Sequence, residues 1–123
     1  MVFPRTKVTI IDNSPIKSAR CIKVFGFKKH RAGKIGQVFK ASTHAMTANP
    51  KKLNLKPLNN FLLVTSRRKH QNRSGISCSF DNSEAILLDN SNQPLASKIP
   101  RPISKNLRGK NQAKLMAIAA TLI

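Results

Sequence analysis

The sequence contains no tryptophan and no tyrosine, and its six phenylalanines are its only aromatic residues. Modules that read single-stranded nucleic acid stack the bases on exposed aromatic rings. Every phenylalanine lies in or beside an apolar run, where we expect the hydrophobic core to take it. The composition therefore disfavours recognition of splayed bases and favours recognition of folded RNA by its shape, through phosphates and 2′-hydroxyls.

Acidic residues are almost as scarce. The 123 residues include 4 Asp or Glu and 23 Lys or Arg, for a formal net charge of +19. So few carboxylates leave little room for acid–base catalysis by paired carboxylates. The core must form against strong self-repulsion, so we expect the isolated chain to be strained without an anionic partner. With 40% hydrophobic residues the chain is no disordered basic tail, and we expect one folded domain over residues 1–123.

Long apolar runs are also missing. The longest, 61–64 and 85–88, fall far short of the ~20 residues that a membrane-spanning helix needs. The N-terminal segment resembles neither a secretory signal nor a transit peptide. We expect the two cysteines, Cys21 and Cys78, to be reduced core residues, with a disulfide as the alternative.

The positive charge is segregated along the chain. No acid lies between Asp12 and Asp81, and none follows Asp89. A solvated helical surface normally interleaves both signs of charge. Such long stretches of one sign indicate a surface that faces phosphate groups.

The distribution of apolar residues predicts mainly β structure. We expect strands over 6–11, 20–27, 35–43 and 58–66, and a hairpin of 75–80 with 85–89 around the turn 81–83. These strands should close into a small barrel that occupies residues 1–95. Lys23 should point outward, and the predicted interior residues are Cys21, Val24, Val38, Leu63, Ile86 and Leu88.

A helical extension over 96–123 should follow the barrel. We expect two short helices within Ile103–Ile123, with Ser104 capping the first and Gly109 separating them. One apolar stripe of the second helix comprises Leu115, Ile118, Ala119 and Leu122. Two interpretations of this stripe remain open: it packs on the chain's own barrel, or it docks a neighbouring protein.

The chemical motifs are weak. Gly33 and Gly36 match the G-x-x-G loop of KH domains, but Val38 and Phe39 continue a strand, so a β-turn is favoured. The histidines, His30, His44 and His70, and the two cysteines show no zinc spacing, and no cofactor site is predicted. A small basic nuclease would need a histidine oriented by a carboxylate, and none is suggested. A free nucleic-acid-binding factor remains open as an alternative function.

The candidate phosphate-binding residues are bases on the segments between predicted strands, where long side chains can reach a partner. They are Lys17, Lys28, Lys29, Arg31, Lys34, Lys51, Lys52, Arg67, Arg68, Lys69 and Arg73.

Several short segments, in order and spacing, resemble the universal large-subunit ribosomal protein fourteen family. They are Asp12–Ser14, Cys21–Gly26, Ile35–Val38, Leu63–Val64, Phe80–Asn82, Ala85–Leu88, Asn90–Pro94 and Leu107–Arg108. The resemblance implies a mainly β fold, a small five-stranded β-barrel with a projecting β-ribbon and short C-terminal helices. It implies a structural, non-enzymatic protein that binds large-subunit rRNA at the face meeting the small subunit. Its implied partners are ribosomal proteins three and nineteen, and small-subunit rRNA across a bridge.

The resemblance adds candidate sites in the C-terminal part. If the apolar stripe docks a ribosomal protein, bases at its edge should face RNA; these are Lys98, Arg101, Lys105, Arg108 and Lys110. The family's Gly-Thr-Arg-Ile-Phe-Gly-Pro stands here as 96–102, in the surface that meets a ribosome-silencing factor in the family. Ser97 and Lys98 keep the hydroxyl and the charge, while Pro100 stiffens the loop. Near the N-terminus, Pro15 replaces a glycine that the family usually has.

The departures from the family pattern bear on the compartment. The chain has eleven asparagines and many lysines and isoleucines, as in proteins of AT-rich organellar genomes. We expect an organelle-encoded mitochondrial member, with the plastid and the bacterial cytoplasm as alternatives.

Overall fold

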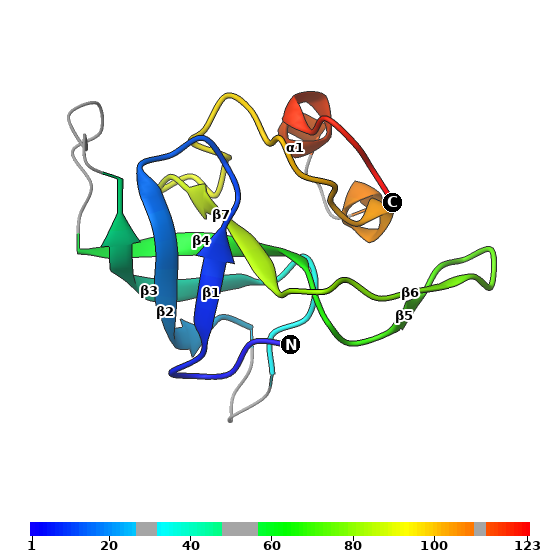
Figure 1. Cartoon of the computed structure of the whole chain (residues 1–123), viewed down its shortest axis with the longest axis horizontal. Helices are drawn as coiled ribbons and strands as arrows, with labels where there is room; N and C mark the ends of the chain where they lie inside the picture. Colours follow the sequence, from blue (N-terminus) through cyan, green and yellow to red (C-terminus); the bar gives the residue numbers. More distant parts are fainter. Residues whose placement is uncertain (27–31, 48–56, 110–112) are drawn as a thin grey trace.

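The computed structural model describes residues 1–26, 32–47, 57–109 and 113–123. Five strands form a closed barrel in the order β1-β2-β3-β4-β7, and two more form a ribbon. Their bounds are β1 Lys7–Ile10, β2 Ile16–Val24, β3 Val38–Met46, β4 Leu58–Thr65, β5 His70–Gln71, β6 Ser77–Cys78 and β7 Glu84–Leu88. A 3₁₀ helix, η1 (Lys105–Gly109), and a helix, α1 (Ala113–Ile118), follow the strands. The predicted fold class is confirmed (Figure 1).

The barrel is closed by one parallel strand pair. β1 runs antiparallel to β2 and parallel to β7, with Thr9 opposite Glu84 and Ile10 opposite Ala85. The other neighbouring pairs in the barrel are antiparallel. Lys23 lies exposed on β2, as predicted.

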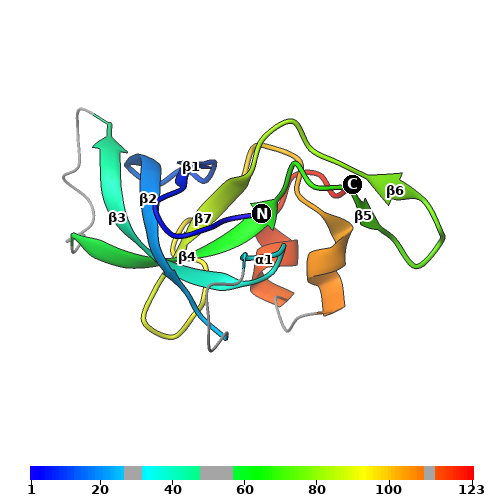
Figure 2. The same ribbon diagram turned by 90° about the horizontal axis from the view of Figure 1, so that it is seen from below.

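The two-stranded ribbon of β5 and β6 projects to one side of the barrel (Figures 1 and 2). The predicted hairpin of 75–80 with 85–89 is wrong, because β6 pairs back with β5 while β7 pairs with β4 and β1. All five residues of β7 are buried, whereas Ser77 on β6 is exposed. A strand that is buried on both faces belongs inside a sheet, so β7 cannot be half of an exposed hairpin.

The hydrophobic residues form two cores, one on each face of β4 and β7. Phe61 and Leu63 belong to the cluster inside the barrel, where the rings of Phe39 and Phe61 stack with centroids 5.8 Å apart. Leu62 and Val64, which face the opposite way, join a second cluster with the C-terminal segment. The apolar runs 61–64 and 85–88 therefore mark strands that are covered on both sides.

Because of this second core, three of the six residues predicted to lie inside the barrel lie outside it. Cys21, Val24 and Leu63 lie in the barrel cluster, as predicted. The other three predicted interior residues, Val38, Ile86 and Leu88, lie in or against the second cluster, between the barrel wall and the C-terminal segment. The prediction did not foresee that the outer face of the barrel is also covered.

The C-terminal segment packs against the chain's own barrel. Leu115 is fully buried in the second cluster, and Ile118, Ala119 and Leu122 pack against it. α1 ends at Ile118, and Ala119 and Leu122 then form bridges to Ile99 and Ile103. The interpretation in which the stripe covers the barrel is therefore the one that the fold shows.

The prediction of two short helices in this segment, with Ser104 as the cap of the first, is also confirmed. The backbone N–H of Asn106 donates to Ser104 Oγ at 3.3 Å, so Ser104 caps the first helix, which is 3₁₀ rather than α. Among the described residues, no helix is long and apolar enough to cross a membrane.

The cysteines and phenylalanines are only partly in the core. Cys21 and Cys78 are free thiols; Cys21 is buried, but Cys78 is half-buried on the ribbon and is not a core residue. Burial raises the pKa of the Cys21 thiol to about 11. The prediction that the core takes every phenylalanine is wrong for Phe3 and Phe25, which are 50% and 39% exposed. Phe80 is half-buried and lies in neither core cluster, and Phe27 lies outside the described residues.

Candidate nucleic-acid interface

All predicted RNA-binding and partner-binding residues within the described part of the chain are exposed. They are Lys17, Lys34, Arg67, Arg68, Lys69, Arg73, Ser97, Lys98, Arg101, Lys105 and Arg108. The remaining predictions lie outside the described residues: Lys28, Lys29, Arg31, Lys51, Lys52 and Lys110.

Lys17 lies on a strand and not on the predicted loop. β2 begins at Ile16, four residues earlier than expected, because Asp12 closes the preceding turn tightly. The Asp12 carboxylate accepts hydrogen bonds from the Ser14 backbone N–H at 3.1 Å and the Leu87 N–H at 2.8 Å. The exposed Lys17 side chain therefore projects from the barrel wall.

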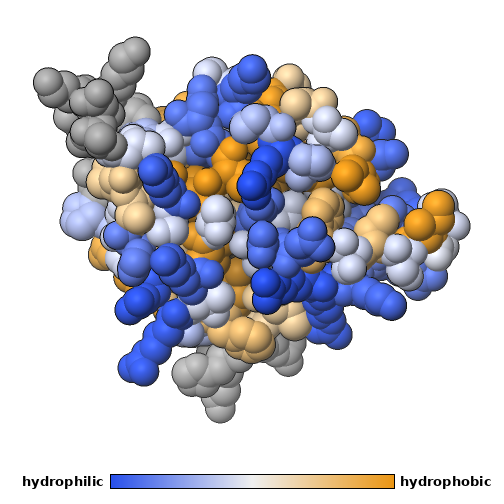
Figure 3. Space-filling model, viewed as in Figure 1, coloured by the Kyte–Doolittle hydropathy of each residue, from blue (hydrophilic) through white to orange (hydrophobic). Residues whose placement is uncertain are grey.

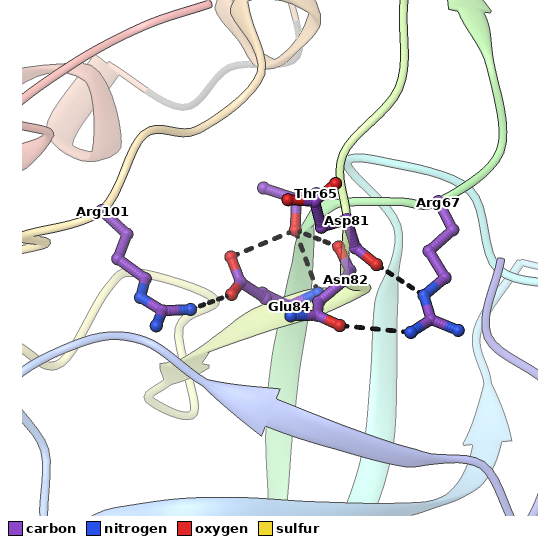
Figure 4. Close-up of polar contacts among 6 residues, drawn as sticks. All are labelled: Thr65, Arg67, Asp81, Asn82, Glu84 and Arg101. Carbon is purple, nitrogen blue, oxygen red and sulfur yellow. Dashed lines mark hydrogen bonds and ion pairs between the residues drawn. The ribbon is translucent and has the colours of Figure 1, made fainter.

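Arg67 braces the base of the ribbon. It follows β4, and its Nε donates to the carbonyl of Asp81 while its Nη2 donates to Asn82 Oδ1 at 3.3 Å (Figure 4). These bonds tie the segment that enters the ribbon to the segment that leaves it. Part of the guanidinium's donor capacity is therefore used within the protein, although the side chain stays exposed.

Arg101 is already paired with an acid. It forms an ion pair with Glu84, whose side chain is 9% exposed, while that of Arg101 is 58% exposed (Figure 4). Thr65 Oγ1 accepts the Glu84 backbone N–H at 3.0 Å and donates to the Asn82 carbonyl at 3.0 Å. Within the described part of the chain this is the one side-chain ion pair. Arg101 therefore offers an anion less net charge than its neighbours do.

Glu84 and Thr65 were not foreseen as structural polar residues. The signal in the sequence was an isolated acid at the start of an apolar strand, but its partner, Arg101, lies far along the chain.

Three of the predicted bases meet around one pocket. Lys34 comes from a β-turn closed by the bond from Gln37 N–H to the Lys34 carbonyl, with Gly36 at φ +84°. This confirms the turn reading of Gly33–Gly36. Arg68 and Lys69 come from the base of the ribbon. The pocket has a volume of about 420 Å³ and is lined by Met1, Lys34, Ile35, Ser66, Arg68, Lys69, His70 and Asn106.

The electrostatics at this pocket are strongly positive. None of the described residues that line it is acidic, and the side chains of Lys34, Arg68 and Lys69 make no ion pair within the described part of the chain. Burial, and then the charge of Arg68, lower the pKa of the Met1 ammonium below its ordinary value of 8.0. Figure 3 shows hydrophilic side chains gathered where the ribbon leaves the barrel. This surface is suited to binding phosphate groups.

The two histidines that the structure describes, His44 and His70, are not arranged with a carboxylate as a catalytic pair would be. His70 Nε2 lies 3.2 Å from Ser104 Oγ, and its ring stacks on Phe80 with centroids 6.0 Å apart. His44 is exposed on β3, and His30 lies outside the described residues. The described residues hold no group of three His, Cys, Asp or Glu side chains that could bind a metal ion.

Ser97 and Lys98 form an exposed segment that is fastened to the turn before β2. Asn13 Nδ2 donates to Ser97 Oγ at 3.0 Å, and the Asn13 backbone N–H donates to the Lys98 carbonyl at 3.3 Å. The Lys98 side chain is exposed.

A comparison with protein families finds one that matches the whole chain. The family described as Ribosomal protein L14p/L23e matches residues 1–123.

Proposed function

The chain belongs to the ribosomal protein L14p/L23e family, and on that premise we propose that it binds large-subunit rRNA through its exposed bases. As a member, it is a non-enzymatic structural protein of the large ribosomal subunit, with rRNA and ribosomal proteins as partners. The observation that carries the rRNA-binding proposal is the cluster of Lys34, Arg68 and Lys69, which no acid offsets.

The remaining bases extend this surface. Lys17 on β2, Arg73 on the ribbon and Arg108 on η1 are exposed and form no ion pair within the described part of the chain. Because they lie on different elements, they should contact different phosphates of one folded RNA. Lys28, Lys29, Arg31, Lys51, Lys52, Lys105 and Lys110 complete the proposed set, and Arg101 stands at its edge.

We further propose that the protein lies at the face of the large subunit that meets the small one. There it would contact ribosomal proteins three and nineteen and contribute a bridge to small-subunit rRNA. The ribbon of β5 and β6 supports this placement, because it projects from the barrel and can reach a neighbouring molecule (Figure 1).

Ser97 and Lys98 are our proposed contact for a ribosome-silencing factor. Their segment is exposed and held by Asn13, so it is presented in one conformation. The proposed compartment is the mitochondrion, with plastid or bacterial cytoplasm as alternatives, on the composition alone.

Sedimentation at moderate salt tests the assembly proposal. The tagged protein, expressed in its source cells, should migrate with the large subunit and stay there through a gradient. Recovery mainly as free protein would contradict the proposal and would favour a free nucleic-acid-binding factor.

Binding of purified protein to large-subunit rRNA tests the surface itself. The logarithm of the association constant should fall linearly with the logarithm of the salt concentration, by about 0.9 per duplex phosphate neutralised. A nearly flat dependence would contradict binding through the exposed bases.

A further inference from the structure

The pocket at the base of the ribbon has the dimensions of a ligand site. Its volume of about 420 Å³ falls within the range of about 300–1,000 Å³ that is typical of small-molecule pockets. Four separate segments form it: the N-terminus, the turn at Lys34, the start of the ribbon and η1. A phosphate on a flat surface would need no such hollow.

Its walls combine three kinds of group. Lys34, Arg68 and Lys69 supply positive charge, Ile35 supplies an apolar wall, and His70 and Asn106 supply polar groups. The Asn106 side chain donates no hydrogen bond to another described residue; its backbone N–H alone is used, by Ser104. Its amide can therefore serve a ligand as donor and as acceptor.

Hydrogen bonds hold the backbone of Lys34 and both the backbone and the side chain of Arg68. Ser66 Oγ accepts the backbone N–H of Arg68 at 3.2 Å, which shapes the turn from β4 into the ribbon. Nη1 of Arg68 lies 3.1 Å from Met1 Sδ, so the guanidinium extends across the N-terminal side of the pocket. The backbone N–H of Lys34 donates to Gln37 Oε1, which fixes its turn.

These features fit one unit of an RNA chain better than a stretch of duplex. A duplex presents phosphates and 2′-hydroxyls on a convex surface and keeps its bases stacked inside, so the apolar wall of the pocket would not be used. An unpaired nucleotide projects from its helix, and can place a base in a hollow while its phosphate meets the cations. No phenylalanine among the described residues lines the pocket, so enclosure by its walls takes the part that an exposed aromatic ring plays in single-strand-binding modules.

We propose that this pocket receives a single unpaired nucleotide of an RNA, with its phosphate held by Lys34, Arg68 and Lys69 and its base inserted toward Asn106 and His70. This inference rests on the proposed rRNA binding and assigns one of its contacts to a specific place.

Fluorescence anisotropy with synthetic RNA tests the proposal on the full chain. The probes are a fully paired RNA duplex and four derivatives, each with one bulged nucleotide: A, C, G or U. At least one bulged duplex should bind about tenfold more tightly than the paired duplex. Arg68→Gln and Lys69→Gln should each remove most of that preference.

Lys17→Gln is the matched control, because Lys17 is also an exposed base but lies on β2 and does not line the pocket. It should weaken the binding of paired and bulged duplexes by a similar factor and leave the preference unchanged. Circular dichroism checks that each variant is folded. If Arg68→Gln or Lys69→Gln does not fold, Lys34→Gln is measured in its place, because Lys34 also lines the pocket.

Four outcomes would contradict either the nucleotide-binding inference or the proposed rRNA binding. Equal affinity of the wild-type protein for all five duplexes would overturn the inference while leaving the proposed rRNA binding standing. Loss of preference in Lys17→Gln as large as in the pocket variants would overturn it too. Binding to none of the RNAs would contradict the proposed function itself. Saturation by adenosine monophosphate without a preference for any bulge would assign the pocket to a free nucleotide and overturn the proposal.

Discussion

The two cysteines differ in burial and should therefore differ in reactivity toward thiol reagents. Cys21 is 1% exposed and burial raises its pKa to about 11, so only about one thiol in 10⁴ is ionised at pH 7. Cys78 is half-buried on the ribbon. We predict that iodoacetamide at pH 7.5 modifies Cys78 in the folded protein and reaches Cys21 only after unfolding, as measured by intact-protein mass.

The control for this labelling is Cys78→Ser. It should take up no label when folded and one label in urea. Rapid labelling at both positions under native conditions would contradict the burial of Cys21.

Glu84 depends on its ion pair with Arg101 for its stability in the fold. Its carboxylate is nearly buried and pairs with Arg101, so removing Arg101 leaves a charge without its counterion. We predict that Arg101→Ala lowers the free energy of unfolding by about 1–2 kcal/mol, less than for a fully buried pair because Arg101 is half exposed. Urea denaturation measures the change.

Two further variants serve as controls for the effect of Arg101→Ala. Arg108→Ala, at an exposed base on η1 with no ion pair among the described residues, should change the unfolding free energy by less than about 0.5 kcal/mol. Arg101→Ala combined with Glu84→Gln should cost less than the sum of the single changes. Additive effects would show that the pair contributes no coupling.

At the scale of elements, the C-terminal segment acts as the second wall of the barrel. Leu115, on the six-residue helix α1, is fully buried among Ile99, Ile103 and Leu107. We predict that Leu115→Ala lowers the free energy of unfolding by about 2–5 kcal/mol, because a helix this short depends on packing. Thermal or urea unfolding measures it.

The neighbouring Lys114 supplies the control, since it is exposed on the same helix. Lys114→Ala should be nearly neutral. If deletion of 113–123 left a normally folded chain that no longer joined the large subunit, the segment would serve a partner rather than this core.

At the scale of the whole molecule, charge opposes folding. A net charge of +19 on 123 residues repels itself throughout the fold. Salt shortens the reach of that repulsion to about 10 Å at 0.1 M. We predict that the melting temperature of the isolated protein rises from 20 to 500 mM sodium chloride, by about 3–6 °C for each 1 kcal/mol recovered. Scanning fluorimetry measures it, and a flat or falling melting temperature would contradict it.

Some features followed from the residues alone. Strands such as Leu58–Thr65 and the turn at Gly33–Gly36 depend on neighbours in the chain, and Ser104 caps a helix that begins one residue later. Charge segregation is likewise a property of the chain and predicted an anionic partner. Local preference and composition suffice for such features.

Other features depended on contacts between distant residues. Leu63 and Ile86 looked alike as members of apolar runs, yet they lie in different cores, because the face of a strand depends on which neighbours pair with it. β6 pairs with β5 and not with β7, because β7 is taken up in the barrel by β1 and β4. A register shift of one residue reverses every face, and a local pattern does not determine the pairing.

The candidate site divides in the same way. The sequence determined that Lys34, Arg68 and Lys69 are exposed bases on segments between strands. Only the tertiary structure decided that they share one pocket, and that Arg101 is paired with Glu84 while these three have no acidic partner among the described residues. The physical reason is that charge along a chain follows from residue types, whereas a site requires side chains from different segments to meet. Here the antiparallel pairing of β3 with β4 brings the turn at Lys34 beside the segment that follows β4.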